Sequence, residues 1–137
     1  MLIKRIKARN FKTYLNLDLY ISVEPEKPII LIGGANGGGK TTLFEAIYGA
    51  LYGLRINTGK YFKELLNAGA LGKEDEKIIL ELQFSGKVLN EEQQYVLTRT
   101  YALNSLNSPV ESVKLNMNGT IFLYGTATHS GQSRKHR

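Results

Sequence analysis

The chain has 137 residues, of which 42% are hydrophobic and 22% charged, and this is the composition of one globular domain or of one lobe of a larger one. It has 0 Cys, which excludes a disulfide framework, a thiolate metal site and a thiol nucleophile. No apolar run approaches the ~20 residues that span a bilayer, and the charged start of the chain is no secretory signal. We therefore expect a cytoplasmic protein with no membrane partner.

The formal net charge of +6 is concentrated at the end of the chain. Residues 126–137 hold three Lys or Arg, no acidic residue and both His, and without them 15 basic residues face 12 acidic ones, a net charge of +3. Because this segment has no apolar periodicity, we predict a lobe over 1–125 and a basic, disordered tail over 126–137. Such a tail can touch nucleic-acid phosphates, although a solvated terminus is the plainer interpretation.

Two strands are predicted at the start of the chain and a third before a loop. Apolar and charged residues mix over 2–9, and over 15–21 every second residue is Leu or Ile, which is typical of an antiparallel strand with one covered face. A Pro-containing turn at 23–28 leads into the unbroken apolar run 29–32. That run predicts a strand covered on both faces.

Two helices and a set of antiparallel strands are expected after the loop. Apolar residues recur at helical spacing over 40–54, where Gly53 weakens the end, and 61–66 predicts a short second helix closed by Gly69 or Gly72. The remaining strands are predicted by period-two alternation at 78–85, 95–100, 113–117 and 121–124. Asn118-Gly119 predicts a hairpin between the last two, so the class is mixed α/β.

The segment Gly34-Ala35-Asn36-Gly37-Gly38-Gly39-Lys40-Thr41 matches the P-loop pattern G-x-x-x-x-G-K-[ST]. Glycines let the backbone N–H groups converge on an anion, and the next helix adds its N–H groups and the positive end of its dipole. Lys40 supplies a cation for the β- and γ-phosphates, and we expect it to be the catalytic lysine; the Thr41 hydroxyl suits Mg²⁺. The predicted ATP-binding residues here are Gly34, Asn36, Gly37, Gly38, Gly39, Lys40, Thr41 and Thr42.

A P-loop alone does not hydrolyse ATP, because the reaction needs a second Mg²⁺ ligand, usually an acidic residue that ends an apolar strand. Glu81, after Ile78-Ile79-Leu80, is the one candidate. The alternation continues past it, so a half-exposed strand residue is the better interpretation. We expect the chain to bind ATP and Mg²⁺ without efficient turnover on its own.

Several segments resemble the SMC-type ABC ATPases, a family that includes the double-strand-break repair, RecF and RecN ATPases. Asn10-Phe11-Lys12 is similar to the family's Asn-Phe-basic signature, and Lys40-Thr41-Thr42-Leu43 with Glu45-Ala46-Ile47 is similar to its P-loop helix. More narrowly, 28–37 and Leu51-Tyr52-Gly53 resemble the DndD ATPases of bacterial DNA phosphorothioate (sulfur) modification. The resemblance covers residues 1 to roughly 101 well, and 102–125 loosely.

This resemblance implies the N-terminal lobe of an ABC-type ATPase head, with a mixed sheet around the P-loop helix and an antiparallel β-meander. It implies a C-terminal lobe and a second head as partners, ATP-driven pairing of the heads, and contact with DNA and with DNA-modification or repair proteins. Lys12 and Thr13 match family positions near the nucleotide phosphates and sugar, 67–76 matches the adenine side, and Arg99 matches a strand arginine. The plainer interpretations are a solvated lysine, a polar connection and a surface cation.

Two other functions are considered. A stand-alone P-loop NTPase or kinase would need parallel βαβ units, which the antiparallel second half disfavours; a basic nucleic-acid-binding module with an inert P-loop would rely on the tail. Aromatic residues allow a further choice between a base-stacking surface and core or lobe-interface packing. They are Tyr14, Tyr48, Tyr52, Tyr61 and Phe62. An exposed apolar surface is expected where a C-terminal lobe would dock.

Overall fold

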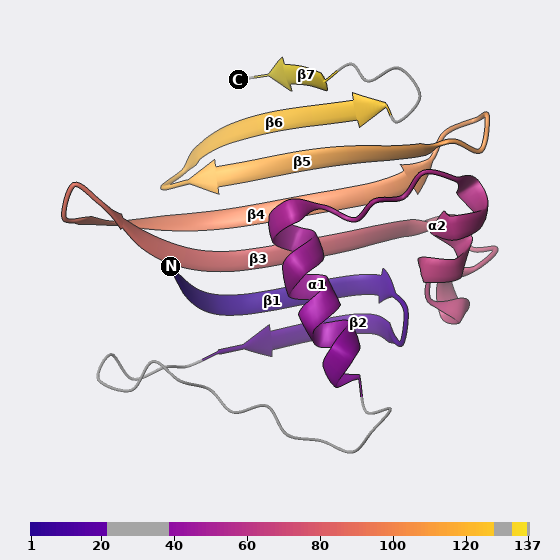
Figure 1. Cartoon of the computed structure of the whole chain (residues 1–137), viewed down its shortest axis with the longest axis horizontal. Helices are drawn as coiled ribbons and strands as arrows, with labels where there is room; N and C mark the ends of the chain where they lie inside the picture. Colours follow the sequence, from indigo (N-terminus) through magenta and orange to yellow (C-terminus); the bar gives the residue numbers. More distant parts are fainter. Residues whose placement is uncertain (22–38, 128–132, 137) are drawn as a thin grey trace.

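The computed structural model describes residues 1–21, 39–127 and 133–136. The elements in chain order are β1 (Leu2–Phe11), β2 (Tyr14–Tyr20), α1 (Lys40–Tyr52), α2 (Gly59–Leu65), the 3₁₀-helix η1 (Ala68–Ala70), β3 (Lys77–Val88), β4 (Glu91–Leu103), β5 (Pro109–Met117), β6 (Thr120–Ala127) and β7 (Ser133–His136) (Figure 1). The predicted strand at 29–32 and the predicted site residues from Gly34 to Gly38 lie outside the described residues.

The strands form one seven-stranded sheet in the order β2-β1-β3-β4-β5-β6-β7, and each neighbouring pair is antiparallel. The antiparallel strands predicted for the second half of the chain are confirmed. Asn118 (φ 51°) and Gly119 (φ 92°) form the predicted tight turn between β5 and β6, because a type I′ turn needs positive φ at both central residues. Helices α1 and α2 lie between β2 and β3 in the sequence.

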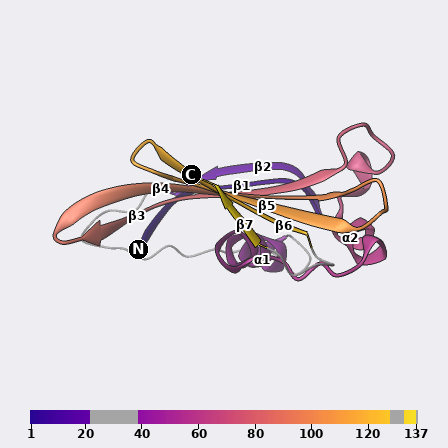
Figure 2. The same ribbon diagram turned by 90° about the horizontal axis from the view of Figure 1, so that it is seen from above.

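Helix α1 crosses one face of the sheet, where it lies against β1, β3 and β4 (Figures 1 and 2). Its sheet-facing residues Leu43, Ala46 and Ala50 are buried, which confirms the predicted helix and its apolar spacing. At Gly49 a Cβ atom would lie 3.0 Å from Leu80 Cδ1 and 2.7 Å from Leu54 Cδ2, so the close approach of α1 to β3 depends on glycine.

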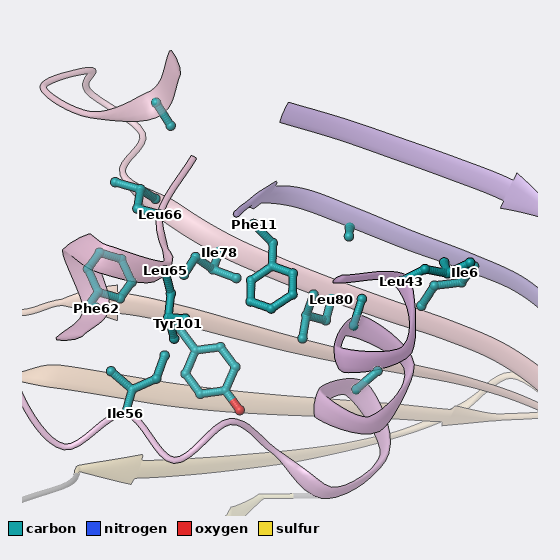
Figure 3. Packing of buried hydrophobic residues seen from close by; sticks show 14 of the residues in the cluster. Ile6, Phe11, Leu43, Ile56, Phe62, Leu65, Leu66, Ile78, Leu80 and Tyr101 are labelled. Atoms are coloured by element: carbon teal, nitrogen blue, oxygen red, sulfur yellow. The ribbon is translucent and has the colours of Figure 1, made fainter. Parts of the chain in front are cut away.

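The core fills the space between α1, α2 and the sheet (Figure 3). Alternate residues of β1 and β3 point into it, and each large apolar side chain buried there stabilises the fold by roughly 1.5–3 kcal/mol. Its largest fully buried members are Tyr101, Phe11, Phe62, Ile6, Ile78, Leu80 and Leu82. This core holds α1 in a fixed position on the sheet.

The second helix differs at its end from the prediction. Helix α2 begins after Thr58, whose hydroxyl accepts the Tyr61 N–H at 3.0 Å, and it stops at Leu65. Closure by Gly69 or Gly72 is therefore wrong. The reason is that Leu66 leaves the helix to form a β-bridge with Phe11, which fixes the chain direction before either glycine.

Two further differences concern the ends of the sheet. Leu15 and Leu19 of β2 are 55% and 38% exposed, although the alternation predicts a covered face there. The tail also differs from the predicted disorder, since β6 continues to Ala127 and 133–136 form β7, paired with β6. Edge main-chain groups can recruit such a strand without any apolar pattern in the sequence. The boundary between lobe and tail stays a prediction.

Candidate nucleotide-binding site

The candidate site is the N-terminal end of α1. Gly39 is the N-cap residue, with φ 89° and ψ 5°, and its carbonyl accepts the Leu43 N–H at 2.9 Å. Among the described residues, no side chain caps this end, and the first turn of the helix holds no acidic residue. The N–H groups of the first turn and the positive end of the helix dipole are therefore left for an anionic ligand, an effect equivalent to about half a charge.

The three side chains that follow Gly39 differ in their accessibility. Lys40 is half-buried and forms no ion pair with any described residue. Thr41 is exposed on the open side of α1, whereas Thr42 is buried under the helix. Lys40 and Thr41 can thus offer their side chains to a ligand, and Thr42 can offer only its backbone N–H.

Tyr14, the first residue of β2, reaches this end of the helix. Its hydroxyl donates to the Gly39 carbonyl at 2.9 Å. A Cβ atom on Gly39 would lie 2.7 Å from the same hydroxyl, so the contact itself requires glycine. The sequence pattern indicated only stacking or packing for Tyr14, because nothing in it connects residues 25 positions apart.

Lys12, predicted to lie near the phosphates, is brought to α1. It adopts φ 49° in the turn after β1, its N–H donates to the Leu65 carbonyl at 2.7 Å, and its carbonyl accepts Asn67 Nδ2 at 2.7 Å. With its backbone so fixed, its Nζ forms an ion pair with Glu45 on α1. Glu45 was missed as a site residue, although it follows Thr41 by one helical turn.

Thr13 and the segment 67–76 are the other positions taken from the resemblance. Thr13 lies exposed in the same turn as Lys12, and Asn67 starts η1 by accepting the Gly69 N–H at 2.8 Å. Beyond η1 the Gly72 N–H donates to Glu76 Oε1 at 2.5 Å, which closes a polar loop. Their predicted contacts with the sugar and adenine stay predictions.

The other end of α1 is closed by side chains from β4 and β5. Arg99 Nε donates to the Ala50 carbonyl at 2.7 Å and Nη2 to the Leu51 carbonyl at 2.9 Å, while Nη1 donates to Glu111 Oε1 at 3.2 Å. The Arg99 side chain is only 14% exposed, so the alternative of a surface cation is wrong. A buried guanidinium here complements the negative end of the helix dipole.

Tyr101 completes this group of side chains. Its hydroxyl accepts the Leu54 N–H at 2.7 Å, just beyond the end of α1. Burial and the hydrogen bond to Glu111 raise the pKa of the phenol well above its ordinary value. Arg99, Tyr101 and Glu111 therefore anchor the C-terminal end of α1 on β4 and β5.

Glu81 lies away from the site. It is in the middle of β3 between Leu80 and Leu82, whose side chains are fully buried toward α1, so its own side chain projects from the other face. There its carboxylate accepts the Thr98 hydroxyl at 3.2 Å and lies 3.9 Å from Lys7 Nζ. This confirms the half-exposed strand residue. In the described parts of the chain no three His, Cys, Asp or Glu side chains gather as a metal site.

The outward side of α1 carries an open groove of about 480 Å³. Its aromatic residues are exposed, Phe44 by 56%, Tyr48 by 63% and Tyr52 by 71%, and the rings of Tyr48 and Tyr52 lie 4.9 Å apart. Of the other aromatics considered, Phe62 is fully buried and Tyr61 is 43% exposed. An exposed apolar surface was expected, and α1 provides one beside Thr41.

This architecture defines the class: a P-loop helix across an antiparallel sheet is the N-terminal lobe of an ABC-type P-loop NTPase. The AAA domain family matches residues 5–124, so the chain belongs to that family, and membership implies nucleotide binding. Among the described residues, no helix has the length and apolar composition to cross a membrane.

Three curated relatives are DNA-repair or nuclease proteins. The chain is 40% identical over 57 residues to the DNA double-strand break repair Rad50 ATPase of Methanocaldococcus jannaschii, covering 42% of the chain and 5% of that protein. It is 32% identical over 119 residues to the DNA replication and repair protein RecF of Natranaerobius thermophilus, covering 85% and 26%. It is 27% identical over 89 residues to the SbcC component of the nuclease SbcCD of Staphylococcus aureus, covering 65% and 9%.

A solved structure adds a looser likeness. It comes from work titled "Structural biochemistry of ATP-driven dimerization and DNA stimulated activation of SMC ATPases", with a TM-score of 0.39 and 18% identity over 100% of this chain and 73% of that one. The family assignment does not depend on it. The relatives support the resemblance to the SMC-type ABC ATPases, and the chain spans about a quarter of RecF and under a tenth of the other two. The narrower DndD resemblance stays a prediction.

Proposed function

We propose that the chain binds ATP with Mg²⁺ at the N-terminal end of α1 and acts as the P-loop lobe of an SMC-like ATPase head that works on DNA. The observation that carries the proposal is the start of α1, which no described side chain caps, where Gly39 is left-handed and Lys40 and Thr41 follow in the first turn. Phosphates are the anions that such a helix end and a neighbouring lysine bind.

The donor set fits a nucleotide and its metal. The N–H groups of the first turn and the Lys40 ammonium would hold phosphate oxygens. The Lys12 side chain is held against the same helix by its ion pair with Glu45. The Thr41 hydroxyl, exposed beside them, would be the protein ligand to Mg²⁺, which neutralises phosphate charge when bound. Gly34, Asn36, Gly37 and Gly38 belong to the same motif.

Turnover needs groups from outside this lobe. Glu81 points away from α1, so no acidic strand end among the described residues faces Thr41. We infer that a C-terminal lobe and a second head supply the acidic residue and the signature motif, and that ATP binding pairs the heads. The exposed aromatic side of α1, with Phe44, Tyr48 and Tyr52, is the surface we assign to the C-terminal lobe.

Two biological processes are candidates for the DNA-directed role. The curated relatives carry the words DNA repair or nuclease in their names, which supports a role in DNA repair. The resemblance of 28–37 and 51–53 to DndD supports DNA phosphorothioate modification instead. A deletion strain of the source organism, scored for sulfur in its DNA and for survival of double-strand breaks, would separate the two.

The binding proposal is tested by calorimetric titration of the chain with Mg·ATP. Wild type should bind one equivalent, and Lys40→Ala should lose at least tenfold in affinity. Lys60→Ala is the matched control, since Lys60 is an exposed lysine in the first turn of the other helix. Equal affinity in wild type and Lys40→Ala would contradict the proposal, as would equal losses in the two lysine variants.

A further inference from the structure

We infer that Tyr14 is a positioning residue for the phosphate site: its hydroxyl fixes the Gly39–Lys40 peptide so that the Lys40 N–H faces the phosphates. This inference rests on the proposed function. Tyr14 itself touches no ligand in this scheme. Its effect passes through the peptide unit that joins the end of the P-loop to α1.

The geometry of that peptide determines where its N–H points. The Gly39 carbonyl accepts two hydrogen bonds, from the Tyr14 hydroxyl at 2.9 Å and from the Leu43 N–H at 2.9 Å. None of the described peptide bonds is cis, and in a trans peptide the C=O and the N–H point in opposite directions. Holding the Gly39 oxygen between Tyr14 and Leu43 therefore turns the Lys40 N–H outward, away from both.

Such a peptide needs holding because a glycine precedes it. Glycine adopts positive and negative φ with similar ease, so the Gly39–Lys40 peptide could rotate at low steric cost and turn its carbonyl toward the phosphates. A carbonyl oxygen there would repel the anion that the N–H should bind. The hydroxyl of Tyr14 raises the cost of this rotation by the hydrogen bond that rotation would break.

Tyr14 is itself held rigidly enough to act in this way. It pairs with Phe11 across the β1–β2 turn, and Phe11 is fully buried in the core. The turn between them is anchored by the Lys12 N–H on the Leu65 carbonyl at 2.7 Å and by Asn67 on the Lys12 carbonyl. The hydroxyl therefore approaches Gly39 from a fixed scaffold rather than from a mobile loop.

The test is Tyr14→Phe, which removes one oxygen atom and keeps the ring. We expect Mg·ATP to bind about fivefold more weakly by calorimetry, as the loss of one hydrogen bond predicts. We also expect faster amide hydrogen exchange at Leu43, with no change at Leu80 in the core. Tyr95→Phe is the matched control, because Tyr95 is a half-buried strand tyrosine stacked on Phe84, with centroids 5.0 Å apart.

The two readouts separate failure of this inference from failure of the proposed function. If wild type binds Mg·ATP and Tyr14→Phe binds it equally well, the positioning role is overturned while ATP binding stands. A wild-type chain that binds no Mg·ATP overturns the proposed function, and with it the assignment to phosphates. In that case, unchanged hydrogen exchange at Leu43 in Tyr14→Phe also overturns the claim that Tyr14 fixes the Gly39–Lys40 peptide. Faster exchange at Leu43 in this variant supports that claim.

Discussion

The guanidinium of Arg99 lies against the last turn of α1, where its Nε donates to the main-chain carbonyl of Ala50 at 2.7 Å. The carbonyls of the last helical turn have no partner within the helix, and a cation beside them also meets the negative end of the helix dipole. Glu111 on β5 compensates the charge of the guanidinium. The helix that carries the proposed phosphate site is thus fixed at its far end by β4 and β5, and at its near end by Tyr14 of β2.

Arg99→Lys should destabilise the fold even though the charge is kept. A lysine ammonium cannot bond the two helix carbonyls and Glu111 with the fork geometry of a guanidinium. We expect the free energy of unfolding to fall by about 2–4 kcal/mol in urea titrations. Arg9→Lys is the control, since Arg9 and Asp75 form an ion pair with side chains 55% and 47% exposed, and it should change stability by less than about 1 kcal/mol. Similar losses in the two variants would show that Arg99 anchors nothing.

Gly53→Ala should be costly for two separable reasons. Gly53 has φ 90° and ψ 153°, a conformation that only glycine adopts without strain of about 1–3 kcal/mol. A Cβ atom would also lie 3.3 Å from Glu111 Oε2 and 3.4 Å from Arg99 Nη1. Gly72→Ala tests a positive φ without crowding, because Gly72 has φ 78° with no atom within 4 Å of the added Cβ. The thermal midpoint of Gly53→Ala should fall further than that of Gly72→Ala, and the reverse order would count against crowding at the anchor.

The local elements of the fold could be predicted because each leaves a periodic trace in the sequence. The apolar residues at helical spacing from Leu43 to Ala50 meet the alternating residues Ile78, Leu80 and Leu82 in the core. Asn118-Gly119 predicted its turn because few other pairs tolerate positive φ twice. Lys40 and Thr41 could be predicted as site residues because phosphate chemistry fixes their spacing from the glycines.

The parts that could not be predicted depend on contacts between distant segments. The alternation in the sequence predicts an ordinary exposed strand residue at Arg99. Only the position of α1 in the structure shows that its side chain faces helix carbonyls. Tyr14 reaches Gly39 from the start of β2, a contact between distant segments that no short pattern encodes. The predicted end of α2 was wrong for a similar reason: the helix ends where Leu66 forms a β-bridge with Phe11, and not at a nearby glycine.

The ion pair between Lys12 and Glu45 should compete with nucleotide binding. If Lys12 contacts a phosphate, the phosphate oxygen must either displace the Glu45 carboxylate from the Lys12 ammonium or bind the ammonium alongside it. The negative charge of Glu45 lies one helical turn from Thr41. We expect Lys12→Met to weaken Mg·ATP binding about tenfold, and Glu45→Gln to tighten it about two- to fivefold. Calorimetry on both variants decides between this scheme and one in which Glu45 merely orients Lys12, since that role predicts weaker binding for Glu45→Gln.

The exposed aromatic side of α1 should matter for assembly and little for folding. Tyr48→Ser with Tyr52→Ser removes two rings that are 63% and 71% exposed, so the free energy of unfolding should change by no more than about 1 kcal/mol. Phe62→Ser, at a fully buried ring, should cost about 3–5 kcal/mol. When the chain is co-expressed with a C-terminal ATPase lobe, the double variant should lose co-purification. Retained co-purification would assign the lobe contact to another surface.

Tyr101 should make the fold sensitive to alkaline pH. Burial, helped by the hydrogen bond to Glu111, raises the pKa of this phenol above its ordinary value of 10.0, so the folded state keeps the proton after the unfolded state has lost it. The contribution of Tyr101 is thus complete below pH 10 and declines above it, by at most about 1.4 kcal/mol per pH unit. Tyr101→Phe should be less stable than wild type near neutral pH, because the Leu54 N–H loses its acceptor. Urea titrations from pH 8 to 11 should show this stability difference shrinking above pH 10. A difference that stays constant across the range would mean that the Tyr101 hydroxyl does not carry the alkaline sensitivity.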